Sequence, residues 1–224
     1  REWSVTSYRG LPGPFDEAVF MAINKIISER PKPVSNPINI GSLRNIAETI
    51  GHDISGRTIK NIREAIQRLH DLRITSNMTY YDANRKKYVI DCFGLFERVI
   101  FTGEMLDNDE KSKTTYIWLN SVYLKNINAG YLSQINFEIY LSLKSYIAKG
   151  LYRFFAPIIP MAKGLPIKFS YDRLADKLQI EKETQLSQIK YQLKDAHNEL
   201  LKKGIFKKIF FFEKGTSYTI NYQP

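Results

Sequence analysis

Residues 42–69 read SLRNIAETIGHDISGRTIKNIREAIQRL, and this stretch predicts a short helix, a brief turn and a longer helix. Ser42 and Ser55 stand where helix N-caps are expected, because a serine hydroxyl accepts a hydrogen bond from a free amide of the first turn. Gly51 is typical of the residue that ends a helix. The buried face of the longer helix is expected to contain Ile59, Ile62, Ile66 and Leu69. This pair of helices is the arrangement of a helix-turn-helix, in which the second helix offers its outer face to a DNA groove.

The segments on either side of this pair complete a familiar order of elements. An amphipathic helix is expected over residues 15–28, and a proline-rich stretch over residues 31–37 ends it. After the pair, residues 74–81 and 87–100 are expected to form two strands, joined by the turn Asp82-Ala83-Asn84-Arg85. Three helices followed by a hairpin indicate a winged helix.

The second half of the chain repeats this order. One helix is expected over residues 137–155, a short helix opens at Ser170 or Tyr171, and a longer helix opens at Glu183 or Thr184. Two strand-like segments, residues 205–212 and 216–222, then predict a second hairpin.

Matching apolar positions support an internal repeat. Ile46-Ala47-Glu48 aligns with Leu174-Ala175-Asp176, and the stripe of the first long helix aligns with Leu186, Ile189 and Leu193. Short apolar matches also arise between unrelated helical domains, so the repeat carries weight only together with the hairpins and the charge. The chain is therefore predicted to be an α+β protein of two tandem winged-helix domains, at residues 1–112 and 113–224.

Charge points to a polyanionic partner. The chain of 224 residues has 33 Lys and Arg against 23 Asp and Glu, which gives a formal net charge of +10. An excess of this size favours nucleic acid, although a basic protein that is merely soluble is about as common. One cysteine and three histidines build neither a disulfide framework nor a zinc cluster, so we expect a cytoplasmic protein without metal or cofactor. The apolar runs are too short to span a bilayer, no signal peptide is visible, and a start at Arg1 predicts a fragment.

Catalytic motifs are missing from the sequence. It has no Walker A spacing, and its histidines lack the paired pattern of a nickase, so we expect no enzymatic activity. Residues 102–113 are expected to form a loop, and the acidic residues Asp107, Asp109 and Glu110 within it are interpreted as a solvated run. Cys92 is expected in the core. The aromatic run Phe210-Phe211-Phe212 suggests base stacking as an alternative, but alternation along a strand predicts that it mostly fills core.

The outer faces of the two long helices supply the candidate DNA-binding residues. Arg pairs with guanine, Asn and Gln pair with adenine, and Ser, Thr or Lys contact phosphates or base edges. The alternative for each residue is that an outer helix face is polar because it is solvated. On the first long helix the candidates are Arg57, Lys60, Asn61 and Arg68. On the second they are Thr184, Ser187, Gln188, Tyr191 and Lys194.

Basic residues are also expected at the tips of the two hairpins, where they approach the DNA backbone or a minor groove. Lysines on hairpins have a second explanation, since they also prevent edge-to-edge aggregation. The candidates are Arg85, Lys86 and Lys87 in the first hairpin, and Lys207, Lys208 and Lys214 in the second.

Short motifs add a resemblance to a known family. Leu11-Pro12 followed by Phe15-Asp16, and Leu151-Tyr152-Arg153-Phe154 in the second half, are moderately specific. Together with the doubled layout they resemble the plasmid replication initiators built of two winged helices, most closely the replication initiator protein A type. The resemblance covers nearly the whole chain.

This resemblance implies a function on double-stranded DNA. Such initiators bind repeated sites at a replication origin, help to melt AT-rich DNA, recruit the host helicase, and often repress their own gene as homodimers. The family pattern makes Thr184, Ser187, Gln188 and Lys194 the primary base-reading candidates and Arg57, Lys60 and Asn61 secondary ones. The first long helix is richer in arginine than the family pattern, which leaves open which of the two domains reads the bases. A transcriptional repressor or partition-type regulator, and a protein-interaction module, are the alternative functions.

Overall fold

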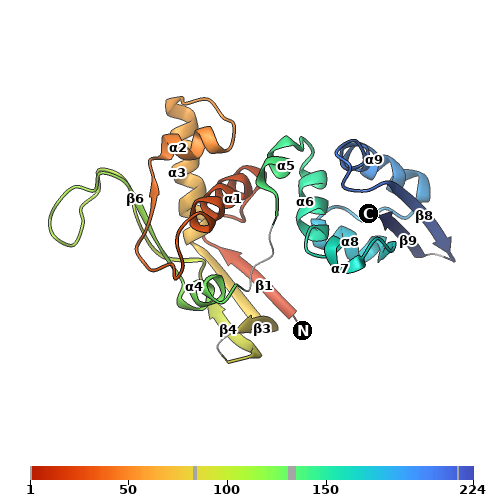
Figure 1. Cartoon of the computed structure of the whole chain (residues 1–224), viewed down its shortest axis with the longest axis horizontal. Coiled ribbons are helices and arrows are strands. Elements are labelled where there is room, and N and C mark those ends of the chain that lie inside the picture. Colours follow the sequence, from red (N-terminus) through yellow and green to blue (C-terminus); the bar gives the residue numbers. More distant parts are fainter. Residues whose placement is uncertain (1, 83–84, 131–134, 216) are drawn as a thin grey trace. The chain divides into compact units, whose positions relative to one another are not determined.

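The structure is a computed structural model that describes residues 2–82, 85–130, 135–215 and 217–224 (Figure 1). The chain divides into two units, Arg1–Leu132 and Ser133–Pro224. The sequence placed the boundary after Ser112, but strand β6 (Thr115–Leu119) pairs with strands of the first unit. Helix α4 (Ser121–Asn128) belongs there too, because Asn128 exchanges two hydrogen bonds with the backbone of Val34.

Three predicted helices form the helical core of the first unit. They are α1 (Pro14–Ser28), α2 (Leu43–Thr49) and α3 (Gly56–His70). The predicted caps are confirmed, since Ser42 accepts a hydrogen bond from the amide of Asn45 and Ser55 accepts one from the amide of Thr58. Helix α1 packs against α2 and α3. The fully buried residues at these contacts include Val19, Ile23, Ile46, Ile62 and Ile66.

A three-stranded antiparallel sheet closes this helical core. Strand β2 (Ile38–Gly41) pairs with β6, and β6 pairs with β5 (Phe96–Ile100), so the order is β2-β6-β5. Alternate residues of β6 are buried, as expected of a strand with one face on the core. The connection from β5 to β6 matches the predicted loop, and Arg98 holds it through a bidentate ion pair with Asp107, at 2.6 and 2.9 Å.

A hairpin inserted in the chain between α3 and β5 pairs with an N-terminal strand to form a second sheet. This sheet contains β1 (Glu2–Ser7), β3 (Leu72–Asp82) and β4 (Lys87–Phe93) in the order β1-β3-β4. The prediction of one strand over residues 87–100 is wrong, because β4 and β5 belong to different sheets. The chain turns at Gly94, where a Cβ would lie 3.2 Å from the carbonyl oxygen of Leu72. Figure 1 shows the β3–β4 hairpin and the β5–β6 hairpin pointing in different directions.

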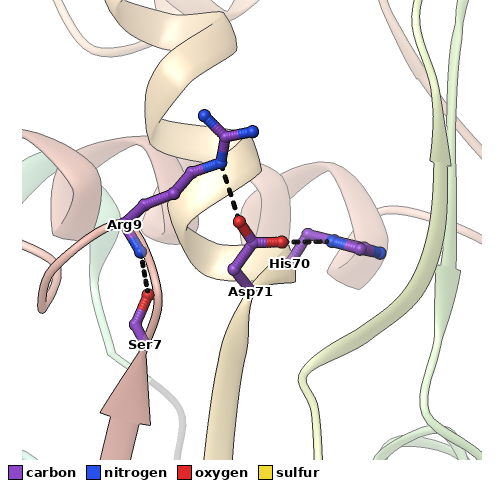
Figure 2. A network of polar contacts seen from close by, with 4 residues as sticks. All are labelled: Ser7, Arg9, His70 and Asp71. Atoms are coloured by element: carbon purple, nitrogen blue, oxygen red, sulfur yellow. Dashed lines mark hydrogen bonds and ion pairs between the residues drawn. The ribbon is translucent and has the colours of Figure 1, made fainter.

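Polar contacts fix β1 to the end of α3 (Figure 2). The carboxylate of Asp71 accepts from Nε of Arg9 at 2.7 Å and lies 2.8 Å from Nδ1 of His70. Ser7 accepts from the amide of Arg9 at 3.3 Å. Burial alone would raise the pKa of Asp71, but the hydrogen bonds from His70 and Arg9 lower it below its usual value. Cys92 on β4 is exposed, so its predicted place in the core is wrong.

The second unit follows the order predicted for it, with more breaks. Its elements in chain order are α5 (Phe137–Ser142), α6 (Tyr146–Phe155), α7 (Ile159–Ala162), β7 (Ile167–Ser170), α8 (Tyr171–Leu178), α9 (Leu186–Lys202), β8 (Lys208–Lys214) and β9 (Ser217–Gln223). The sheet order is β7-β9-β8.

The predicted single helix over residues 137–155 is two helices. The carboxylate of Glu199 on α9 accepts hydrogen bonds from the amides of Lys144, at 2.7 Å, and Ser145, at 3.1 Å. The hydroxyl of Ser145 then caps α6 by accepting from the amide of Ala148. These partners turn the chain between α5 and α6, and they come from a helix far along the sequence.

Aromatic side chains fill the core of the second unit. Phe155 of α6 contacts Phe206 and Tyr222, and all three are almost completely buried. Nε2 of the buried His197 lies 3.1 Å from the hydroxyl of Tyr222. Burial lowers the pKa of His197 to about 4, so this histidine is neutral near pH 7.

The two units share one topology. In each, a helix, a strand, a short helix, a longer helix and a two-stranded hairpin follow in that order, and the strand before the short helix pairs with the last strand of the hairpin. In the first unit, the β3–β4 hairpin is inserted between the longer helix and β5. The aligned motifs 46–48 and 174–176 both lie on the short helix, so the sequence repeat corresponds to a structural one. Among the described residues, no helix is long and apolar enough to cross a membrane.

Candidate nucleic-acid interface

The first half of α9 presents an exposed polar surface. Ile189 and Leu193 of this helix are fully buried, whereas Ser187, Gln188 and Tyr191 are exposed. The predicted residues Ser187, Gln188 and Tyr191 line one groove, and 83% of Tyr191 is exposed. We refer to these three residues as the α9 face. Lys194 is exposed one turn further along the helix.

A buried tyrosine holds the turn before α9. The hydroxyl of Tyr171 accepts from the amide of Glu183 at 2.8 Å and donates to Oε1 of Gln192 at 2.9 Å. Nε2 of Gln192 donates to the carbonyl oxygen of Glu181, at 2.9 Å. These bonds join α8, the turn and α9, and they fix the start of the helix on which the α9 face stands. Burial raises the pKa of Tyr171 above its ordinary value. Nothing in the sequence indicated this role, because a tyrosine at a helix start also fits a simple core position.

Thr184 lies outside α9, contrary to prediction. The helix begins at Leu186, and the carbonyl oxygen of Thr184 accepts a hydrogen bond from the hydroxyl of Tyr218 on β9, at 3.1 Å. This contact ties the hairpin to the turn. Thr184 is exposed and is only three residues from Ser187 in the chain.

Helix α3 carries the corresponding basic surface in the first unit. Arg57 and Lys60 are exposed and Asn61 is half-buried. Lys60 lines a groove together with Arg44 of α2 and Arg63, neither of which was predicted. The guanidinium of Arg63 lies 4.1 Å from the ring centre of Phe101 and pairs with Glu104. The positive charge of Arg44 could have suggested it as a DNA-binding candidate. Its place beside Lys60 and Arg63, however, is set by the packing of α2 against α3.

Arg68 lies apart from this group. Its Nη2 is 2.7 Å from Oδ1 of Asp16 and its Nε is 3.0 Å from Oδ2. Asp16 is buried and also accepts from the amide of Gly13, at 2.8 Å. The hydrogen bonds that Arg68 donates to Asp16 raise the pKa of the guanidinium. Arg68 therefore joins α1 to α3.

The predicted basic tip of the first hairpin lies on the inserted sheet. Arg85, Lys86 and Lys87 are exposed at the β3–β4 turn, and the amide of Arg85 donates to Asp82 at 3.0 Å. Residues 83 and 84 of the predicted turn lie outside the described residues. By strand order, the hairpin that corresponds to β8–β9 is β5–β6, whose connection carries the exposed Lys111 and Lys113.

The three lysines predicted at the second tip are separated in the structure. Lys208 pairs with Gln223 at the open end of the hairpin, and the amide of Lys207 donates to the carbonyl oxygen of Gln223 at 2.7 Å. Lys214 pairs with Ser217 at the turn. Only Lys214 is thus placed at the tip, and the prediction for Lys207 and Lys208 is corrected.

Comparison with known proteins shows a likeness of fold. No protein-family model and no curated protein matches the chain. It is similar to the crystal structure of selenomethionine derivatives of domains 2 and 3 of RctB, with a TM-score of 0.63 and 15% identity. That match covers 99% of this chain and 85% of the other. A second RctB structure, of domains 2–3, matches at a TM-score of 0.59 and 14% identity, over 99% and 86% of the two chains. The chain therefore has the fold of RctB domains 2 and 3.

Proposed function

We propose that the chain is a non-enzymatic, sequence-specific double-stranded DNA-binding protein in which each unit is a winged helix. The observation that carries the proposal is the α9 face, an exposed row of hydrogen-bonding side chains on a helix whose start is fixed by Tyr171. Gln188 would read adenine, and Ser187 would contact phosphate or a base edge. Tyr191 and Lys194 extend the contact along the groove.

The strand order supports the winged-helix assignment. In each unit the short and long helices precede an antiparallel hairpin whose last strand also pairs with the strand before the short helix. This hairpin follows the helices directly in the second unit, and it follows the inserted β3–β4 hairpin in the first. A helix pair and an adjoining hairpin form a surface that places one helix in a major groove and the hairpin beside the backbone. In the first unit, the surface that corresponds to the α9 face is formed by the predicted residues Arg57, Lys60 and Asn61. Arg44 of α2 lies beside them.

We further infer a role at a replication origin, where the chain would bind origin repeats. The short motifs and the doubled layout of the sequence resemble plasmid replication initiators. The chain also shares the fold of domains 2 and 3 of RctB. The net charge of +10 fits a DNA partner. Homodimer formation, repression of its own gene and recruitment of a host helicase are parts of the same proposal, carried by the resemblance to plasmid initiators.

Selection of random duplex DNA on the purified chain, followed by sequencing of the bound pool, tests the proposal. We expect an asymmetric motif of roughly two helical turns, because two unequal units would read different half-sites. A symmetric inverted repeat would instead support a dimer on a palindrome, which fits a transcriptional repressor or the autorepressing form of the initiator. Absence of any enriched sequence would refute sequence-specific binding.

A matched pair of variants then tests the α9 face on the selected site. Gln188→Ala is expected to weaken specific binding by about 1–3 kcal/mol and to leave binding to random DNA nearly unchanged. Asn198→Ala, an exposed amide further along α9, is the control and should leave both affinities unchanged. Equal losses for Gln188→Ala on specific and random DNA would contradict base reading by this residue.

A further inference from the structure

Two phenylalanines of β8 are exposed on the open face of the second unit's sheet. Phe211 packs inward, with its ring centre 5.6 Å from that of His197 on α9. Its neighbours Phe210 and Phe212 point to the other side and are 46% and 52% exposed. The prediction that this aromatic run mostly fills core is therefore wrong for two of its three residues.

The strand register defines the rest of this face. Phe210 pairs with Asn221, which pairs with Lys168 on β7, and Phe212 pairs with Thr219. Paired residues of adjacent strands point to the same side of a sheet. The open face consists of Lys168, Ser170, Lys208, Phe210, Phe212, Thr219, Asn221 and Gln223.

The chemistry of the open face is that of a single-strand-binding surface. Lys168 and Lys208 are exposed at its two sides, and none of its positions holds a carboxylate. Exposed rings stack on bases without regard to sequence, while lysines attract the phosphates. We propose that the open face of the β7-β9-β8 sheet binds single-stranded nucleic acid, with one base stacked on each of Phe210 and Phe212.

The spacing of the two rings favours a single strand over a duplex. Residues two apart in a strand are separated by roughly 7 Å. Stacked bases of a duplex are spaced by about 3.4 Å, so consecutive stacked bases do not match the two rings. An unstacked strand can place consecutive bases on both. A protein partner is less favoured, because positive charge beside the rings calls for a polyanion.

Duplex recognition by α9 and single-strand binding by the open face are separable. Helix α9 covers the inner face of the sheet through Phe211, and the open face lies on the opposite side. Loss of one activity therefore does not entail loss of the other, and variants on the two surfaces distinguish them.

Binding of a fluorescent thymidine oligonucleotide of about 12 residues, followed by anisotropy, tests the inference. The double variant Phe210→Leu/Phe212→Leu keeps apolar side chains in the strand but removes both rings. We expect its affinity to fall at least about tenfold, with duplex binding unchanged. Tyr146→Leu, an exposed aromatic residue of α6, is the control and should bind like the parent chain. Gln188→Ala should lower duplex binding alone.

Two further measurements complete the test. For Lys168→Ala/Lys208→Ala, the slope of log K against log salt concentration for oligonucleotide binding should become shallower by about 1.4. Each lysine that contacts a phosphate of a single strand contributes about 0.7 to this slope. In the parent chain, NMR signals of the Phe210 and Phe212 rings should shift on addition of the oligonucleotide. The inference is wrong if the parent chain does not bind it, or if a folded double-leucine variant binds it equally well. It is also wrong if the double-leucine variant alters self-association in sedimentation but does not alter oligonucleotide binding. That result would mean that the open face binds a second copy of this chain.

Discussion

Arg68 of α3 holds Asp16 of α1 in a bidentate ion pair, with Nη2 2.7 Å from Oδ1 and Nε 3.0 Å from Oδ2. Asp16 is 5% exposed and Arg68 is 26% exposed at their side chains, so the pair is largely shielded from water. Because Asp16 also accepts from the amide of Gly13 at the start of α1, one carboxylate connects a helix cap to the neighbouring helix.

This geometry predicts a loss of stability when Arg68 is replaced. Arg68→Gln removes the positive partner of a buried carboxylate, which costs about 3–5 kcal/mol in a fully buried pair. The partial exposure of Arg68 reduces that figure, so we expect about 2–3 kcal/mol less free energy of unfolding in urea. Specific DNA affinity of the folded variant should not change.

Lys60→Ala is the matched control on the same helix. Lys60 is exposed and its Nζ lies 3.9 Å from Glu64, so its removal should change stability by less than about 0.5 kcal/mol while weakening DNA binding. If Arg68→Gln instead lowered DNA affinity at unchanged stability, Arg68 would contact DNA and the ion pair would be incidental.

Arg68 also shows where reasoning from sequence reaches its limit. Apolar periodicity correctly located α1, α2 and α3, and the two serine caps followed from local hydrogen-bonding chemistry. Periodicity separates the buried stripe from the rest of the helix, but it does not tell whether a flanking arginine faces solvent or a second helix. That depends on Asp16, which is far away in the sequence.

Tertiary partners also explain the other errors. The break between α5 and α6 depends on Glu199, and the assignment of β4 and β5 to different sheets depends on which strand each one meets. Alternation indicated strand segments where β3, β4, β5, β8 and β9 lie, but it did not indicate their neighbours, and it missed β1, β2 and β7. For Phe210 and Phe212, three consecutive aromatic residues gave no polar alternation, so the exposed face of β8 could not be told from the buried one.

The network around Tyr171 predicts a coupling between the core and the α9 face. Tyr171→Phe removes one hydroxyl, which leaves the amide of Glu183 without its acceptor and should cost about 1–3 kcal/mol of stability. Because the turn before α9 loses this support, specific DNA binding should weaken as well, by up to the 1–3 kcal/mol of one base contact. Titration of the folded variant with the selected site and with random DNA measures this difference.

Tyr152→Phe provides the comparison. The hydroxyl of Tyr152 accepts from the amide of Asn136 at 2.9 Å, on the α5–α6 side of the unit, so its loss should reduce stability without changing DNA affinity. Equal effects of the two variants on DNA binding would show that the Tyr171 network serves stability alone.

The two hairpins of the first unit predict different salt dependences. If the β3–β4 tip lies on the DNA backbone, Lys86→Ala/Lys87→Ala should weaken binding to all sequences and flatten the salt slope by up to about two units. Lys111→Ala/Lys113→Ala, on the β5–β6 connection, is the matched pair. Filter binding between about 50 and 200 mM salt measures both slopes. If only Lys111→Ala/Lys113→Ala altered the salt slope, the contact with the DNA backbone would be made by the β5–β6 connection and not by the β3–β4 tip.

The buried His197 predicts a dependence of stability on pH. Its pKa is lowered to about 4 by burial, against a usual value of 6.5, so the unfolded chain binds more protons than the folded chain between these values. The free energy of unfolding should therefore be highest above pH 6.5 and fall as the pH drops toward 4, by up to about 3 kcal/mol. Carboxylates titrate mainly below pH 5, so the decline between pH 6.5 and 5 is the diagnostic part.

Urea unfolding of the chain and of His197→Gln at several pH values separates this contribution from others. Glutamine does not titrate, so the variant should lose most of the decline between pH 6.5 and 5. Its stability at pH 7 should be lower, because the hydroxyl of the buried Tyr222 loses the partner that lies 3.1 Å away in the parent chain. An identical pH profile in both proteins would mean that His197 is protonated in the folded state at its ordinary pKa, and that water reaches the core between α9 and β9.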